Sequence, residues 1–156
     1  MIDYVVLSLG ELLREGYKEK IEDAYKKFFC SRETDLENFL ICKSTEYDNI
    51  GFGKTYLIID KDKLIGQLGR SDTYSSQDIS GETILNECYH AISKAAKAVC
   101  GRVVVLECRE WIFEKFYKQQ GFKMFYKEQT KEQLYTLYKR INFEEYWPVE
   151  CNEIRD

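Results

Sequence analysis

One stretch in the middle of the chain constrains the fold most, because it reads as strand, long helix and strand in direct succession. Residues 64–70 read as a strand weakened by two glycines, residues 81–99 repeat apolar side chains at helical spacing, and residues 102–108 form a nearly continuous apolar run. Two strands joined through a helix form a crossover, and such crossovers are right-handed. An unbroken apolar run is typical of a strand that is covered on both faces. The stretch therefore predicts a mixed α/β fold.

The rest of the sequence predicts shorter elements on both sides of this stretch. Residues 61–63 are a tight polar link, so the strands 55–60 and 64–70 are expected to form an antiparallel hairpin. Gly66 and Gly69 weaken the second strand and mark a bulge or a close approach to its backbone. The remaining predicted strands are 4–9, 122–126 and 133–141, and the remaining predicted helices are 9–13, 17–29, 34–49 and 110–120.

Composition and charge limit the class of protein. With 156 residues the chain is about the size of one domain, and its net charge of -4 weighs against nucleic acid or an anionic membrane as a partner. The first ten residues carry an acid where a signal peptide carries basic residues, and no run approaches the roughly 20 apolar residues of a membrane span. We therefore expect a cytoplasmic globular protein.

The six cysteines do not predict a metal site. They form no C-x-x-C pair, and the single histidine, His90, is the only residue that could join them as a nitrogen ligand. We expect reduced thiols that mostly fill the core. His90 lies off the apolar stripe of the helix 81–99 and is expected to face solvent.

The loop that leads into the helix 81–99 is the first candidate for chemistry. The first amides of a helix lack internal partners and carry partial positive charge, so the start of a helix attracts anions. Gly81 has no side chain to keep a phosphate away from these amides. A plain capped helix, with Asp78 or Ser80 as its cap, explains the same residues.

The segment F-Y-K-Q-Q-G-F is the second candidate. Its tyrosine, Tyr117, lies one helical turn before Gly121, where the predicted helix ends. A tyrosine hydroxyl within hydrogen-bond reach of a leaving group acts as a general acid. The alternative is a tyrosine that only packs in the core or lies on the surface.

Together these segments resemble the GNAT superfamily of acetyl-CoA-dependent N-acetyltransferases. The resemblance spans roughly residues 4–140 and rests on the order of apolar strand, phosphate-type loop, long helix, buried strand and F-Y-x-x-x-G-F. In the first half, L-E-N-F-L, then Glu46-Tyr47, then G-K-T-Y-L resemble a subgroup that includes acetyltransferase toxins of bacterial toxin–antitoxin modules. The resemblance implies a GNAT-like fold in a single domain, residues 1–141, followed by an acidic C-terminal tail, residues 142–156.

The resemblance also implies how acetyl-CoA would be held as the co-substrate, without a metal. L-I-G-Q-L-G-R resembles the strand that presents the cofactor in the family. Backbone groups at its end would bond to the pantetheine arm, and these belong to Leu68, Gly69 and Arg70. Amides at the start of the long helix would hold the diphosphate, and these belong to Ile79, Ser80, Gly81 and Glu82.

Two side chains receive a catalytic role from the resemblance. Tyr117 matches the family tyrosine that protonates the departing thiolate. Glu107, in the apolar run 102–108, is the candidate base that takes a proton from the amine, directly or through water. A solvated carboxylate at the end of a strand is the alternative for Glu107.

The sequence departs from the family in two places. In the family loop Q/R-x-x-G-x-G/A, the register that keeps Gly81 puts Ser76 and Ile79 at the first two signature positions. The family also has an extra strand between those that correspond to 55–60 and 64–70. Either residues 64–70 take the third-strand position, or one strand is lacking between Asp60 and Leu64. A partner chain, for example in a homodimer, would fill such a gap.

Three functions follow from these observations. The first is an N-acetyltransferase that acts on a primary amine of a small molecule or a protein. The second is a degenerate GNAT fold that binds a partner or a nucleotide without catalysis, which the altered loop and the short hairpin favour. The third is a toxin-like enzyme that acetylates aminoacyl-tRNA, which the first half favours and the acidic charge opposes, because binding to RNA needs Lys and Arg.

Overall fold

The computed structural model describes residues 2–61, 63–67, 69–99 and 102–146. The chain divides into two compact units, residues 1–88 and 89–156, and each is described by itself. The helix α5 (Gly81–Val99) begins in the first unit and continues into the second. No helix among the described residues is long and apolar enough to cross a membrane.

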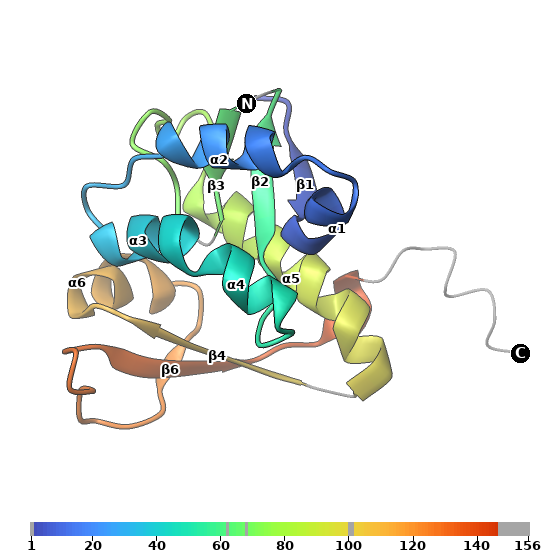
Figure 1. Cartoon of the computed structure of the whole chain (residues 1–156). Helices are drawn as coiled ribbons and strands as arrows, with labels where there is room; N and C mark the ends of the chain where they lie inside the picture. Colours follow the sequence, from blue (N-terminus) through green and yellow to red (C-terminus); the bar gives the residue numbers. More distant parts are fainter. Residues whose placement is uncertain (1, 62, 68, 100–101, 147–156) are drawn as a thin grey trace, which may run out of the picture. The chain divides into compact units, whose positions relative to one another are not determined.

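The first unit contains one antiparallel sheet with helices packed against it. Its elements are β1 (Val5–Ser8), α1 (Leu9–Arg14), α2 (Lys18–Lys26), α3 (Thr34–Cys42), α4 (Ser44–Asn49), β2 (Tyr56–Asp60), β3 (Lys63–Gly66) and the start of α5. The strand order is β1-β2-β3, and both neighbouring pairs are antiparallel. Figure 1 shows α2, α3 and α4 in front of this sheet.

Both faces of this sheet are buried, each in its own apolar cluster. In β2, Leu57 packs with residues of α1, α2 and α3, whereas the next residue, Ile58, packs with Ile79 and with Ile84 of α5. Successive side chains of a strand point to opposite faces, so this alternation follows from the strand geometry. The helices α1 to α3 therefore cover one face, and the start of α5 covers the other.

The hairpin of β2 and β3 confirms the prediction that these strands are antiparallel. Lys61, in the tight link, has a positive φ of 55°. The prediction that the second strand runs to Arg70 is wrong, because β3 ends at Gly66 and the chain turns back, so that Gly66 pairs with Arg70. A Cβ at Gly66 would overlap the carbonyl oxygen of Gly69. The glycine is therefore needed for this turn, and the close approach predicted at it comes from the chain itself.

The predicted helix 34–49 is two helices in the structure, α3 and α4. They meet at Lys43, whose φ of -127° is not helical. The hydroxyl of Ser44 donates to the Leu40 carbonyl at 2.6 Å and lies 3.0 Å from the hydroxyl of Tyr25. A serine that bonds back to a carbonyl of the preceding turn competes with the helix ladder and bends the helix.

The second unit contains a separate antiparallel sheet. Its elements after α5 are β4 (Val103–Cys108), α6 (Glu110–Ile112), the π-helical turn η1 (Phe113–Tyr117), β5 (Lys123–Met124), β6 (Tyr135–Arg140) and the 3-10 turn η2 (Phe143–Tyr146). The strand order is β4-β6-β5. Phe143 is buried, so the beginning of the predicted tail packs against the protein, and residues 147–156 lie outside the described residues.

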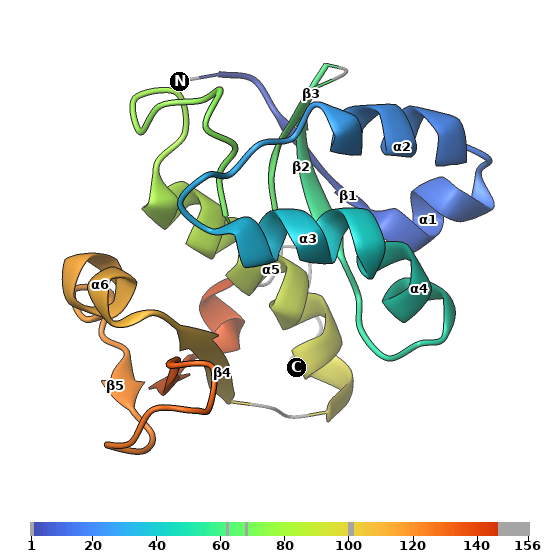
Figure 2. The same cartoon turned by 60° about the vertical axis from the view of Figure 1, so that its left-hand side comes forward.

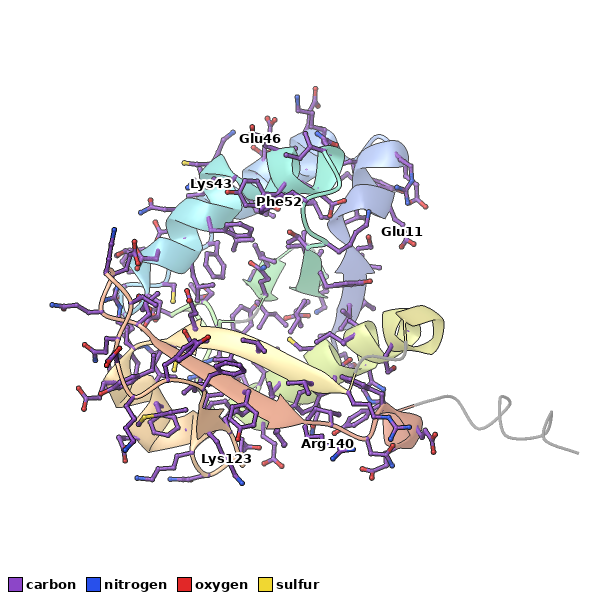
Figure 3. The ribbon with its side chains drawn as sticks, turned by 90° about the horizontal axis from the view of Figure 1, so that it is seen from below. Glu11, Lys43, Glu46, Phe52, Lys123 and Arg140 are labelled. Carbon is purple, nitrogen blue, oxygen red and sulfur yellow. The ribbon has the colours of Figure 1, made fainter. Side chains whose placement is uncertain are left out.

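The prediction that residues 102–108 are covered on both faces is wrong. Val103 and Val105 are 54% and 55% exposed, whereas Cys108 is buried. The exposed residues alternate with more buried ones along β4, so one face of this strand is turned to solvent. Figure 3 labels Lys123 and Arg140, which lie with Val103 and Val105 on this exposed face according to the register of the sheet.

Two tyrosines packed against the same apolar cluster give a matched prediction about stability. The hydroxyl of Tyr4 donates to Glu87 at 2.7 Å, whereas the buried hydroxyl of Tyr74 has no hydrogen-bond partner among the described residues. We expect Tyr4→Phe to lower the free energy of unfolding by about 1–2 kcal/mol, because a bond to a charged group is lost. Tyr74→Phe should leave it unchanged or raise it. Denaturant unfolding of both variants measures the difference, and equal losses would contradict this assignment.

Candidate functional site

The entry to α5 is capped by Ser80. Its hydroxyl oxygen accepts a hydrogen bond from the amide of Thr83 at 3.0 Å, and the Ser80 carbonyl accepts the first helical bond from Ile84 at 3.1 Å. Of the two caps considered from the sequence, Ser80 is the one that the structure shows. Asp78 instead accepts the amide and the hydroxyl of Ser75, both at 2.7 Å, and these bonds lower the pKa of the Asp78 carboxyl.

The amides of Gly81 and Glu82 have no hydrogen-bond partner among the described residues. They follow the loop that leads into α5, drawn in green in Figure 2. The preceding amide, that of Ile79, donates to the Ser75 carbonyl at 3.3 Å, and the Ile79 side chain is 2% exposed in the apolar cluster. The Ile79 side chain is therefore directed into the core. Two adjacent amides at the positive end of a long helix remain able to bind an anion.

The segment predicted to hold the pantetheine arm turns back along β3 and forms one isolated bridge with it, between Arg70 and Gly66. Leu68 lies outside the described residues. The amide of Gln67 donates to the Gly69 carbonyl at 3.1 Å, and the amide of Ser71 donates to the Ile65 carbonyl at 2.7 Å. These two bonds flank the pair of Gly66 and Arg70, so the amide and carbonyl of Arg70 point away from β3. Of the three residues predicted for this role, Arg70 presents its backbone outward.

The side chain of Arg70 connects this segment to the entry of α5, which sequence reasoning did not anticipate. Its Nη1 donates to the Ile79 carbonyl at 2.8 Å. Burial lowers the pKa of Arg70, and the positive charge of Arg32 acts in the same direction, while Asp78 and Asp72 oppose it. No sequence pattern signals this contact, because it depends on the chain turning back after Gly66.

Tyr117 is buried at the end of the π-helical turn η1 in the second unit. Its ring lies edge-on to Phe116 and Phe122, with centroids 5.1 and 5.2 Å away. Gly121 adopts a φ of 81° and ends this segment, as the sequence predicted. Single-turn π-helices are rare and frequently occur at functional sites. The aromatic contacts hold the tyrosine ring in one orientation.

Glu107 lies in β4, on the solvent-exposed face of the sheet β4-β6-β5. It is exposed and pairs with Thr136, whose hydroxyl donates to it at 3.4 Å. Phe113 covers the opposite face of this sheet, which carries Tyr135, and the two ring centroids are 6.2 Å apart. Tyr117 also lies on this covered face, because its ring packs against that of Phe122. The structure therefore does not bring Glu107 and Tyr117 together on one face.

Among the described cysteines, Cys30 and Cys108 are buried. Burial raises the pKa of Cys88 to about 11, which keeps this thiol protonated at neutral pH. Within residues 2–61, 63–67, 69–99 and 102–146, no three histidine, cysteine, aspartate or glutamate side chains group as metal ligands do. His90 is exposed, as predicted.

Comparisons with known proteins support the fold through structure and not through sequence. No protein-family model matches the chain, and no curated protein matches it in sequence. A bacterial toxin of known structure is similar to it, with a TM-score of 0.72 and 10% sequence identity over 100% of this chain and 98% of that chain.

Structures of the toxin AtaT are also similar. A tyrosine-to-phenylalanine variant bound to the C-terminus of the antitoxin AtaR and to acetyl-CoA has a TM-score of 0.63 at 14% identity, over 98% of this chain and 99% of that chain. The AtaTR complex bound with acetyl-CoA has a TM-score of 0.61 at 14% identity, over 97% of both chains. The chain therefore has the mixed α/β, GNAT-like fold that its sequence predicted.

Proposed function

We propose that this protein is an N-acetyltransferase that moves an acetyl group from acetyl-CoA to a primary amine. The observation that carries the proposal is the match of the whole chain to a toxin whose structure contains acetyl-CoA. A likeness of fold alone is an analogy, so the site must supply the chemical reasons. Those reasons are the two unpartnered amides at the start of α5 and the buried Tyr117.

The proposed mechanism is direct transfer between two bound reactants. The neutral amine attacks the thioester carbon, a C–N bond forms and the C–S bond breaks. Tyr117 gives its hydroxyl proton to the departing thiolate. The amine loses its proton to water, because Glu107, the base predicted from the sequence, lies on the sheet face opposite Tyr117. Binding both reactants side by side supplies much of the rate by proximity.

The amides of Gly81 and Glu82 would hold the diphosphate of acetyl-CoA. Charge on the diphosphate would be stabilised by the dipole of α5, whose 19 residues make it the longest helix among those described. Two contacts would keep these amides in position. Ser80 caps the helix, and the Ile79 carbonyl accepts a bond from Arg70. Gly69 and Arg70 would meet the pantetheine arm, and Leu68 stays a prediction outside the described residues.

A protein partner belongs to the proposal. The toxin AtaT was solved bound to the C-terminus of its antitoxin AtaR, which favours a toxin-type protein with an antitoxin-like partner. The acceptor amine is then a small molecule, a protein or an aminoacyl-tRNA, and the net charge of -4 still opposes RNA. A homodimer and a cytoplasmic location also stay proposals.

A non-catalytic GNAT-like fold is the second candidate. The segment that turns back after β3 favours this candidate, because it leaves few backbone groups for a ligand. The amide of Asp72, for example, already donates to the Phe29 carbonyl at 2.7 Å. Asp72 also accepts the amide and the hydroxyl of Ser31, at 2.7 and 2.6 Å. The outward backbone available to a ligand is thus limited to Arg70 in this part of the described chain.

Thermal unfolding with acetyl-CoA separates the two candidates. A ligand at 100 times its Kd stabilises the folded state by about 2.7 kcal/mol. For a chain of this length we expect about 1 mM acetyl-CoA to raise Tm by about 5–10 °C. A thioester of acetate with cysteamine, which lacks the diphosphate, should give a much smaller shift. No shift with acetyl-CoA would favour the non-catalytic fold.

A further inference from the structure

The ammonium group of Lys139, in β6, lies over two aromatic rings of the second unit. Its Nζ is 5.3 Å from the ring centroid of Tyr89 in α5 and 5.8 Å from that of Phe122. A cation this close to an aromatic ring is attracted to it, and the attraction grows as the cation loses contact with water. Lys139 is half-buried and has no ion pair with a described residue. The two rings are therefore the contacts that fix its charged end.

The stem of the Lys139 side chain also lies against the turn that ends the segment of Tyr117. A Cβ at Gly121 would lie 3.8 Å from Cε of Lys139, within ordinary van der Waals contact. Gly121 turns the chain with a φ of 81°, a conformation that favours glycine. The lysine therefore runs along this turn and ends over the ring of the next residue, Phe122.

Phe122 connects this contact to Tyr117 in two ways. Its ring is buried and lies edge-on to the Tyr117 ring, with centroids 5.2 Å apart. Its amide donates to the Tyr117 carbonyl at 3.0 Å. A shift of Phe122 would therefore move both the ring and the backbone of the tyrosine. A group that transfers a proton works only within a narrow range of positions, so such a shift would lower the rate.

We infer that Lys139 is a positioning residue for Tyr117, whose ammonium group holds Phe122 in the place where the Phe122 ring fixes the tyrosine. This inference rests on the proposed function and adds a residue to it that no sequence motif indicates. Lys139 touches neither reactant in this role, because it acts through Phe122. Tyr89 supplies the second ring, so the long helix α5 takes part in the same arrangement.

Kinetics with acetyl-CoA test this role, with lysinamide as the amine probe and release of coenzyme A as the signal. Lys139→Met keeps a long side chain without the charge. We expect it to lower kcat by about tenfold, with an unchanged Kd for coenzyme A. Lys139→Arg should restore most of the turnover, because a guanidinium also stacks on aromatic rings. Lys139→Gln, which is neutral and polar, should give the same loss as Lys139→Met and replaces it if that variant does not fold.

A double-mutant cycle shows whether the lysine acts through the tyrosine. In the Tyr117→Phe background, Lys139→Met should cause no further fall in kcat, because the group that it positions is already gone. A loss of equal size in both backgrounds would mean that the ammonium group acts on the reactants directly, or that the variant only weakens the fold. Either result would overturn the inference.

Hydrogen exchange gives a readout that does not depend on activity. The Phe122 amide should exchange about tenfold faster in Lys139→Met than in the unchanged protein, because its bond to the Tyr117 carbonyl opens more often. Lys118→Met is the matched control. The Lys118 ammonium lies 5.9 Å from the ring centroid of Phe113, but its side chain is 59% exposed and paired with Glu114. This variant should change neither kcat nor the exchange of the Phe122 amide.

The outcomes separate the inference from the proposed function. If the unchanged protein releases coenzyme A and Lys139→Met does so equally fast, the inference is wrong and the proposed function stands. If Lys118→Met gives the same losses as Lys139→Met, the effect is not specific to the contact with Phe122, and the inference is again wrong. If the unchanged protein releases no coenzyme A from acetyl-CoA, the proposed function fails, and the role of Lys139 in catalysis fails with it.

Discussion

Tyr117→Phe is expected to lower turnover with acetyl-CoA by about 10²- to 10⁴-fold, with little change in the affinity for the cofactor. The variant removes one hydroxyl group and keeps the ring that packs edge-on against Phe116 and Phe122. The thiolate would then have to leave without a proton donor at hand. Steady-state kinetics with a fixed amine, together with a Tm measurement, separate loss of chemistry from loss of folding.

The leaving group gives a sharper readout of the same role. A general acid matters less as the leaving thiol becomes more acidic, because the departing thiolate then needs less protonation. We expect the deficit of Tyr117→Phe to shrink with an acetyl thioester of a more acidic thiol. Tyr138→Phe, whose half-buried ring lies 5.7 Å from Phe125 on the other face of the sheet, is the matched control and should keep its turnover. A deficit independent of the thiol would remove Tyr117 from proton transfer.

The parts of the fold that could be predicted are those governed by local patterns. The helix 81–99 has an apolar stripe and a glycine at its start, and the structure shows α5 with the same bounds. The hairpin of β2 and β3 followed from a three-residue polar link. Each of these signals lies within a short stretch of sequence, so both elements could be predicted without knowledge of tertiary contacts.

Features that depend on distant contacts could not be predicted. The composition of residues 102–108 suits a buried strand, yet β4 pairs with β6 alone among the described strands and leaves Val103 and Val105 exposed. This burial depends on whether another layer covers that face of the sheet, which is a tertiary feature. The turn after Gly66 and the bond from Arg70 to the Ile79 carbonyl likewise depend on contacts between segments that are not adjacent in the sequence.

The π-helical turn η1 also has no sequence signature. Residues 110–120 read as an ordinary helix, but Phe113–Tyr117 shifts to a wider turn, and the amide of Phe122 bonds to the Tyr117 carbonyl at 3.0 Å. A one-residue shift of this kind changes the face on which the tyrosine lies. The sequence could therefore propose Tyr117 as the acid without indicating what surrounds it.

Asp48→Ala is expected to lower the free energy of unfolding by about 2–4 kcal/mol, because it leaves a buried amide unpaired and removes a charge-assisted bond. The Asp48 side chain is 2% exposed, and its Oδ2 accepts the amide of Thr55 at 3.1 Å, which ties α4 to the chain that enters β2. Its ion pair with Lys54, at 3.5 Å, contributes little, because the Lys54 side chain is 59% exposed. Lys54→Ala should therefore cost less than about 1 kcal/mol.

Gly10 tests whether the carboxylate of Asp48 is fixed in this position. Gly10 lies in α1, where alanine normally stabilises a helix by about 0.5–1 kcal/mol. Here a Cβ would overlap Oδ1 of Asp48 and lie 3.3 Å from its Cγ, so Gly10→Ala should destabilise the protein by about 1–3 kcal/mol. In the Asp48→Ala background that overlap disappears, and the same change should become neutral or stabilising. Denaturant unfolding of the four proteins measures this coupling, and additive losses would show that the carboxylate moves aside freely.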